Sequence, residues 1–320
     1  MARRRSQVRW GMLPAVDRGV RAAMREAVVV FVNPAAGGGR ARRHAARAVA
    51  LLEAGGLRLE TVISSGPGHL DELASREAER GRARVIALGG DGTLSEVARG
   101  LLAVPDAVTT LGVVPLGTGN DFIKSTGLPR TWRAACARLA AGCTPRAIDA
   151  GQVNGRWFVN GVGFGFDAAI TRAMLQKRWL PGPLAYGAGL LDALRNGVAA
   201  PACALQWDGG EDRRPMTLVA ACNGQYVGGL FRLAPRAMPD DGALDLVWAD
   251  ALSAMQVLRH APRVVRGTHE GLPVAHFARS RRLEIDSAFG MPAQADGELL
   301  GEDLSHLSIR LAAGALRLWA

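Results

Sequence analysis

The chain has 320 residues, which is enough for two domains with a core in each. Its 48% hydrophobic and 21% charged residues are typical of a globular protein and exclude a disordered chain. The formal net charge of +10 leaves anionic membranes and anionic substrates open as partners. No basic run is interleaved with aromatic residues, so we expect no nucleic-acid partner.

Residues 1–26 form a basic N-terminal tail that includes Arg3, Arg4 and Arg5. The tail lacks the hydrophobic centre of a signal peptide, and no apolar run in the chain approaches the length of a transmembrane helix. The four cysteines have no C-x-x-C spacing, which predicts reduced thiols. We therefore expect a cytoplasmic protein.

The next part of the chain alternates between strand and helix patterns. Residues 27–32 (AVVVFV) are a continuous apolar run, which predicts a buried parallel strand. Further strands are expected at 57–63, 85–88 and 111–114, and helices at 40–55, 69–80 and 131–141. This alternation predicts a parallel, right-handed α/β sheet.

Residues 85–97 (VIALGGDGTLSEV) combine a strand, a glycine turn and a helix. The glycines let the backbone approach an anion, and the helix that follows offers free N–H groups. Thr93 can cap this helix or touch a phosphate oxygen. Asp91 would repel bound phosphate unless a cation lay between them, so the pattern indicates a site for Mg²⁺ and a nucleotide. An ordinary strand-to-helix turn is the alternative interpretation.

Three loops rich in glycine and polar residues follow predicted strands, at 33–39, 89–95 and 117–121. In a parallel sheet, ligands bind at the carboxyl ends of the strands. The three loops are far apart in sequence, but this topology brings them to one edge of the sheet. Their convergence predicts one ligand site.

Beyond Ala147 the pattern changes to short apolar or alternating segments that are separated by turns. This change predicts an antiparallel β domain with a boundary near Asp149. We expect strands at 150–153, 157–162, 202–207, 217–222, 243–248, 282–286 and 304–319, and helices within 167–197 and at 250–266.

An ordered set of six motifs resembles the diacylglycerol-kinase-type lipid kinase family, especially its bacterial soluble members. The motifs are NPxxG at 33–37, GGDGT at 89–93, GTGND at 117–121, NGVGFGFD at 160–167, PxA with DGxLD at 235–245, and DGE at 296–298. Single motifs also occur in NAD kinases and phosphofructokinases, whereas the ordered set is specific. The resemblance implies a Rossmann-like α/β nucleotide-binding domain at 27–149, an antiparallel β-sandwich domain at 150–307, and a return of 308–320 to the first domain.

The resemblance also implies that ATP binds between the two domains. Ser64 stands where the family often has threonine, and Ser95 stands where the family commonly has asparagine. The nucleotide-binding residues that it implies are Asn33, Ser64, Gly90, Asp91, Gly92, Thr93, Leu94, Ser95, Glu96 and Thr118.

The late Asp296-Gly297-Glu298 motif supplies the expected catalytic carboxylates. A lipid hydroxyl is a poor nucleophile until its proton has an acceptor. From the residues alone, Asp296 fits a general base and a β-turn equally well, because Asp-Gly favours tight turns. The resemblance assigns the base to Asp296 and a supporting role to Glu298.

Two cation sites are implied by the same resemblance. Asp91, Asp121 and Asp149 correspond to a carboxylate set that holds Mg²⁺ near the phosphates, although each also fits a cap or a turn. A structural cation is expected at Asp241, with backbone oxygens from Met238 and Ala243.

The sequence therefore predicts an ATP-dependent lipid kinase that phosphorylates a lipid hydroxyl. The alternatives are an NAD-kinase-like enzyme with a small soluble substrate and a non-catalytic nucleotide-binding regulatory protein. The expected cofactors are ATP and Mg²⁺. The expected partners are a lipid at the membrane surface, which the positive charge favours, and a second copy of the chain in a homodimer.

Overall fold

A parallel sheet with helices on both faces forms the N-terminal part of the computed structural model, which describes residues 27–319 apart from 178, 179 and 181. The strands lie in the order β2, β1, β3, β4. They span Val28–Val32 (β1), Leu59–Ile63 (β2), Arg84–Gly89 (β3) and Thr110–Pro115 (β4). The basic tail expected at 1–26 lies outside the described residues.

Five helices accompany this sheet. They span Ala36–Ala54 (α2), His69–Glu79 (α3), Asp91–Leu102 (α4), Asp121–Thr126 (α5) and Trp132–Ala141 (α6). Alternate residues of β1 face opposite sides, so Val29 and Phe31 pack with α3 and α4, while Val30 packs with α2 and α6. Both faces of the strands are buried, which explains their continuous apolar runs.

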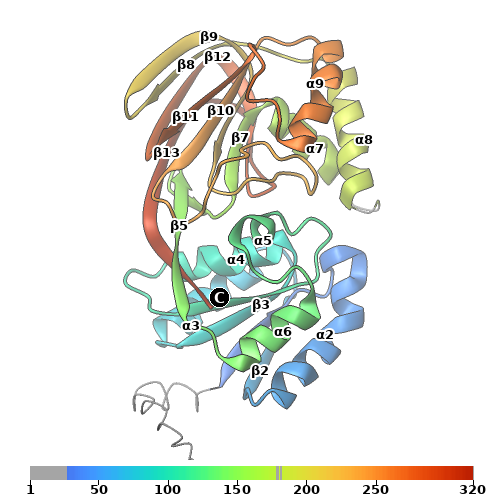
Figure 1. Cartoon of the computed structure of the whole chain (residues 1–320), viewed down its shortest axis with the longest axis vertical. Coiled ribbons are helices and arrows are strands. Elements are labelled where there is room, and N and C mark those ends of the chain that lie inside the picture. Colours follow the sequence, from blue (N-terminus) through green and yellow to red (C-terminus); the bar gives the residue numbers. More distant parts are fainter. Residues whose placement is uncertain (1–26, 178–179, 181, 320) are drawn as a thin grey trace, which may run out of the picture.

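The C-terminal part is an antiparallel β-sandwich-like domain with three helices at one side (Figure 1). Its strands span Pro145–Val153 (β5), Arg156–Phe158 (β6), Gly161–Gly165 (β7), Ala202–Trp207 (β8), Gly210–Cys222 (β9), Leu244–Asp250 (β10), Ala275–Ser280 (β11), Arg282–Ala295 (β12) and Glu298–Trp319 (β13). Its helices span Phe166–Leu175 (α7), Gly182–Arg195 (α8) and Ala254–Arg266 (α9). None of the described helices is long and apolar enough to cross a membrane.

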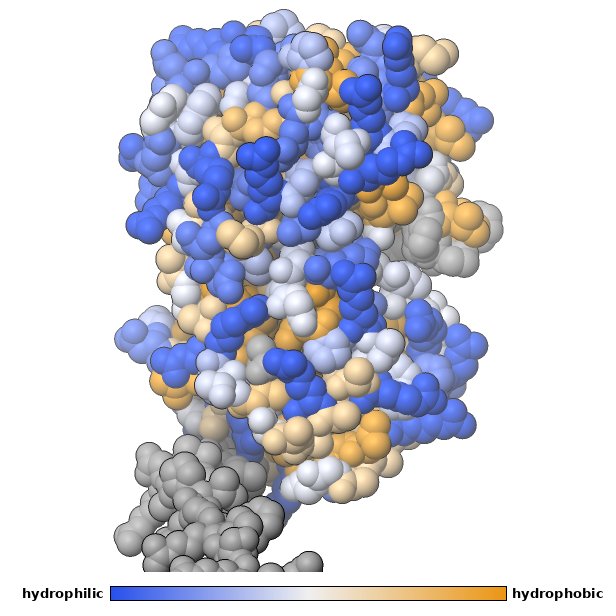
Figure 2. Space-filling model, in the orientation of Figure 1, coloured by the Kyte–Doolittle hydropathy of each residue, from blue (hydrophilic) through white to orange (hydrophobic). Residues whose placement is uncertain are grey.

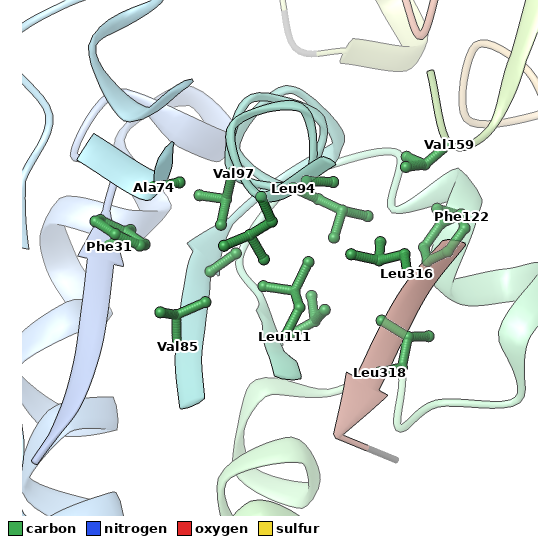
Figure 3. Close-up of a cluster of buried hydrophobic side chains, with 14 of the residues drawn as sticks. Phe31, Ala74, Val85, Leu94, Val97, Leu111, Phe122, Val159, Leu316 and Leu318 are labelled. Carbon is green, nitrogen blue, oxygen red and sulfur yellow. The ribbon is translucent and has the colours of Figure 1, made fainter. Parts of the chain in front are cut away.

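The long strand β13 links the two domains. Its first part pairs with β12, and its last residues run parallel to β4, with Leu318 opposite Leu111. Figure 3 shows Leu316 and Leu318 pointing into the cluster that contains Leu111 and Phe122. The chain therefore crosses from one domain to the other near 145 and again along β13, which holds the two domains side by side.

Two expected elements differ in the structure, and one strand was not expected. The single strand expected at 157–162 is two strands, β6 and β7, because the amides of Val159 and Asn160 between them donate to a side chain instead of to a neighbouring strand. The helix expected from residue 250 begins at Ala254, where Ser253 and Gln256 form a capping box. The strand β11 was not expected.

Candidate active site

A cleft of about 1250 Å³ lies between the two domains. One wall is formed by the loops that follow β1, β3 and β4, together with α3 and α4. The other wall includes the β6–β7 connection, α7 and the tight turn between β12 and β13. The cleft therefore joins the carboxyl ends of the parallel strands to the C-terminal domain.

The three glycine loops meet at this cleft, as the sequence predicts. A Cβ atom on Gly37, whose φ is +63°, would lie 2.2 Å from the carbonyl oxygen of Leu116. A Cβ atom on Gly117 would lie 2.5 Å from the Cα atom of Gly90. These two close approaches are possible because no side chain stands between the backbones, and they bring the three loops together.

Eight of the ten predicted nucleotide-binding residues line the cleft, namely Asn33, Ser64, Asp91, Gly92, Leu94, Ser95, Glu96 and Thr118. Gly90 and Thr93 are not among the lining residues. Thr93 turns back against Gly89 and is buried, so the expectation that it caps α4 is wrong: the N-cap residue is Gly90, and no side chain caps this end. Glu96 accepts a hydrogen bond from the amide of Leu70 and so helps to fix α3.

Asp91 and Asp121 come together at the cleft floor. Asp91 accepts a hydrogen bond from the amide of Phe122, and Asp121 accepts one from Lys124 Nζ at 2.9 Å and another from the amide of Gly229 at 2.8 Å. The pKa of Asp91 is raised to about 7, first because its carboxyl is buried and then because Asp121 is close. Two neighbouring carboxylates of this kind suit a divalent cation that also binds phosphate oxygens.

Asp149 does not join Asp91 and Asp121. It is buried, and its two carboxylate oxygens accept hydrogen bonds from the amides of Gly242 and Gly314, each at 2.7 Å. Within residues 27–319 as described, no group of three or more His, Cys, Asp or Glu side chains is placed to hold a metal ion. Asp149 instead ties the 239–243 turn to β13.

At the expected structural cation site, the Asp241 carboxylate is bonded to Arg279 in this structure. One carboxylate oxygen of Asp241 is bonded to Arg279, and the other accepts a hydrogen bond from the amide of Ala243. Arg279 also lies 3.7 Å from Asp245, so its guanidinium supplies the positive charge between the two carboxylates.

Asp296 lies at the turn between β12 and β13, where φ is +49° at Asp296 and +82° at Gly297. This conformation explains the Asp-Gly pair in the sequence. One carboxylate oxygen accepts from the amides of Asn160 and Gly161 at 2.8 and 3.0 Å. The other accepts from the amide of Val159 and from the hydroxyl of Ser95, both at 2.8 Å. These donors fix the carboxylate at the cleft wall, facing α4.

Glu298 forms an ion pair with Arg99 of α4 at 3.3 Å and another with Arg156. Arg99 also contacts Asp71 of α3 through two nitrogens, at 3.0 and 3.1 Å. Burial raises the pKa of Asp71 to about 6, and Arg99 opposes that shift. Glu298 therefore belongs to a charged network that spans the two domains beside Asp296.

A small apolar cavity of about 120 Å³ adjoins the cleft. It lies beneath α9 and is also lined by α7, α8 and the sheet. Asp167, Tyr186 and Val227 line both the cleft and this cavity. Asp167 is buried, accepts from Gln294 Nε2 at 2.7 Å, and has its pKa raised by burial.

Sequence reasoning missed Asp71, Arg99, Arg156, Asp167 and Tyr186 among the cleft residues. Arg99 carried a usable signal, because its spacing from Ser95 and Asp91 places all three on one face of α4. Asp71 and Arg156 carried none, because each reaches the network only through the tertiary arrangement of its element.

Comparison with known proteins agrees with this architecture. Residues 27–153 match the family model described as "Diacylglycerol kinase catalytic domain", and residues 160–320 match the "YegS C-terminal NAD kinase beta sandwich-like domain". A diacylglycerol kinase of Bacillus subtilis (strain 168) is 30% identical over 282 residues, which cover 87% of this chain and 91% of that protein.

Two further matches cover most of the chain. A Chromohalobacter salexigens protein named "Probable lipid kinase YegS-like" is 33% identical over 229 residues, covering 71% of this chain and 73% of that protein. A crystal structure of a diacylglycerol kinase from Bacillus anthracis str. Sterne has the same fold, with a TM-score of 0.70 and 21% identity, and covers 92% of this chain and 96% of that one.

Proposed function

Since the chain belongs to the diacylglycerol kinase family of lipid kinases, we propose that it transfers the γ-phosphate of ATP to the hydroxyl group of a lipid. The observation that carries the proposal is the composition of the cleft. A glycine-lined backbone cradle lies on one wall, a fixed carboxylate lies on the other, and an apolar cavity adjoins the second wall.

The first wall suits the polyphosphate of ATP. A Cβ atom on Gly92 would meet nothing within 4 Å, so the backbone there is open to the cleft, and the N-terminus of α4 adds a positive dipole end. Asp91 and Asp121 would hold Mg²⁺, which would neutralise phosphate charge during transfer. Binding this cation favours the ionised form of Asp91 over the protonated form.

The second wall suits the acceptor. Asp296 takes the proton as the lipid oxygen forms its bond to the γ-phosphorus, and the bond from that phosphorus to the bridging oxygen of ADP breaks. Four groups already donate hydrogen bonds to Asp296. The acceptor hydroxyl can donate a fifth hydrogen bond, or it can replace the hydroxyl of Ser95. Arg99 and Arg156 hold Glu298 beside this point.

The apolar cavity favours a lipid over a small soluble acceptor. It contacts the cleft at Asp167 and Tyr186, so a hydrocarbon chain attached to the reacting hydroxyl has an apolar place to enter. An NAD-kinase-like reaction has no use for such a cavity. A non-catalytic protein would not require the carboxylates of Asp91, Asp121 and Asp296 at the cleft. We propose that the protein works in the cytoplasm and contacts the membrane that holds its substrate.

The test is a transfer assay with ATP labelled at the γ-phosphate. The purified chain is mixed with Mg²⁺ and either total lipid extract or NAD, and the labelled product is identified. We expect a labelled lipid, no labelled NADP, and loss of label with Asp296→Asn. Label in NADP alone would support the NAD-kinase-like alternative, and no label in any product would support the non-catalytic one.

A further inference from the structure

The helix α9 is an arginine-rich surface helix of the C-terminal domain. Arg259, Arg263 and Arg266 are exposed, and the helix contains no aspartate or glutamate. No ion pair is found for these three arginines among the described residues. The nearby carboxylates have other partners, because Asp192 of α8 pairs with Lys177 and Arg195, and Glu270 pairs with Arg236. The helix therefore presents unneutralised positive charge to its surroundings.

Large apolar side chains are exposed beside these arginines. Met255 is 73% exposed and Leu258 is 43% exposed, both on α9. Leu230, which is 51% exposed, lies in a loop that is fixed to α9 by a hydrogen bond from the amide of Arg232 to the carbonyl of Val264 at 3.1 Å. Figure 1 shows α8 and α9 along one edge of the molecule, and Figure 2 shows hydrophobic residues gathered along that edge.

The opposite side of α9 covers the apolar cavity. Val257, Ala261 and Val264 line that cavity, yet no residue of the helix is fully buried. The helix is well defined at both ends, by its capping box and by Gly267 in a left-handed conformation. The helix therefore lies between the apolar cavity and the outside of the molecule.

We infer that α9 is the surface by which this protein docks on an anionic lipid bilayer, with Met255 and Leu258 inserted at the interface and Arg259, Arg263 and Arg266 at the lipid phosphates. This inference rests on the proposed lipid acceptor. Arginines free of carboxylates complement an anionic surface, and adjacent exposed apolar side chains gain from leaving water. Docking here places the bilayer against the helix that covers the cavity.

The test is flotation of the full chain with vesicles, without ATP. Vesicles of phosphatidylcholine alone are compared with vesicles that also contain phosphatidylglycerol. We expect binding to the mixed vesicles that weakens as salt rises from about 0.1 M to about 1 M, which shortens the Debye length from about 10 Å to about 3 Å. The triple variant Arg259→Gln, Arg263→Gln and Arg266→Gln should lose about a hundredfold in affinity, at roughly fivefold for each charge.

The double variant Met255→Ser and Leu258→Ser should lose about tenfold or more, because both side chains would otherwise be buried in the interface. The matched controls change the same residue classes elsewhere. Val108→Ser with Phe289→Ser removes two other exposed apolar side chains, and Arg47→Gln, Arg213→Gln and Arg310→Gln remove equal charge. Both controls should bind as the unmodified chain does.

Three results would overturn the inference. The unmodified chain does not float with the mixed vesicles, or the α9 variants float as well as their controls, or light scattering shows a dimer that Met255→Ser with Leu258→Ser converts to a monomer. The last result would assign the surface to a second copy of the chain. A chain that floats through α9 but labels no lipid would contradict the proposed kinase activity and leave the docking surface in place.

Discussion

The hydroxyl of Ser95 on α4 donates a hydrogen bond to the Asp296 carboxylate at 2.8 Å, across the boundary between the two domains. Arg99 Nη1 lies 3.2 Å from the same hydroxyl, which therefore joins the turn at Asp296 to the charged network of α3 and α4.

Ser95→Ala should weaken the fold slightly and leave turnover largely intact. Three backbone amides still hold Asp296 without the hydroxyl, so we expect a loss of about 1 kcal/mol in unfolding free energy, the usual worth of one hydrogen bond. The rate of lipid phosphorylation should fall less than about tenfold, whereas Asp296→Asn should cost about a hundredfold or more. Urea unfolding and initial rates measure the two effects. Equal losses in both variants would show that Asp296 needs Ser95 to act.

Gly92→Val should strongly weaken ATP binding without unfolding the protein. A Cβ atom at Gly92 meets nothing within 4 Å, so the larger side chain projects into the cleft rather than into the fold. Calorimetric titration with Mg²⁺ and ATP should detect at least a tenfold loss of affinity, while the thermal midpoint stays close to that of the unmodified chain. Gly117→Ala is the matched contrast, because its Cβ would lie 2.5 Å from Gly90 and should destabilise the fold itself. Unchanged affinity in a folded Gly92→Val protein would exclude this loop from nucleotide binding.

The stability of the free protein should depend on the protonation of Asp91. The pKa of this carboxyl is raised to about 7, so the folded state binds a proton that the unfolded state releases between about pH 4 and pH 7. The stabilisation of the unmodified chain relative to Asp91→Asn should therefore be fully present near pH 4 and be lost as the pH rises through 7. Urea unfolding of the two proteins across this range measures the difference.

Added Mg²⁺ should restore stability above about pH 7 in the unmodified chain and not in Asp91→Asn. Parallel pH profiles for the two proteins would contradict the raised pKa of Asp91. A response to Mg²⁺ in both would show that the cation binds elsewhere.

Arg99→Met should destabilise the contact between the domains. The Arg99 side chain is only 10% exposed, and its removal leaves Asp71 and Glu298 without their shared partner. We expect a loss of about 1–3 kcal/mol in unfolding free energy, because Arg99 is buried while its two carboxylate partners are about one-third exposed and partly screened by solvent. Arg76→Met is the control, since its pair with Glu72 is exposed and should contribute less than about 1 kcal/mol. Similar losses of unfolding free energy in the two variants would contradict the larger contribution to stability that is expected of Arg99.

Leu318→Ala should destabilise the N-terminal domain although residue 318 lies far from it in sequence. Leu318 is fully buried beside Leu111 and Phe122 in the first domain (Figure 3). Its truncation should cost about 2–5 kcal/mol in chemical denaturation, whereas the exposed Ile63→Ala should cost little. A cost for Leu318→Ala as small as that for Ile63→Ala would mean that the end of β13 adds nothing to this core.

The strands and helices of the first domain could be predicted because their patterns are simple. The apolar run of β1 requires burial on both faces, and Thr131 caps α6 where the sequence suggests that a helix starts. The break between β6 and β7 could not be predicted, because it depends on amides that turn toward Asp296, more than one hundred residues later in the chain.

The glycine loops of the site were predictable, because a close approach of two backbones requires glycine and glycine is visible in the sequence. The hydrogen-bond partners of Asp149 and Asp241 could not be predicted from the sequence. Each is a carboxylate in a suitable motif, and only the folded chain shows backbone amides bonded to one and Arg279 bonded to the other.

The parallel pairing of β13 with β4 sets an order for folding during synthesis. When the ribosome has made the first four strands, β4 still has open N–H and C=O groups along one edge, and the pocket beside Leu111 lacks Leu316 and Leu318. The nucleotide-side domain therefore cannot be completed before the rest of the chain has left the ribosome. Until then, its exposed edge strand is a site where a nascent chain can pair wrongly with another, and a chaperone that covers this edge would have its greatest effect on yield.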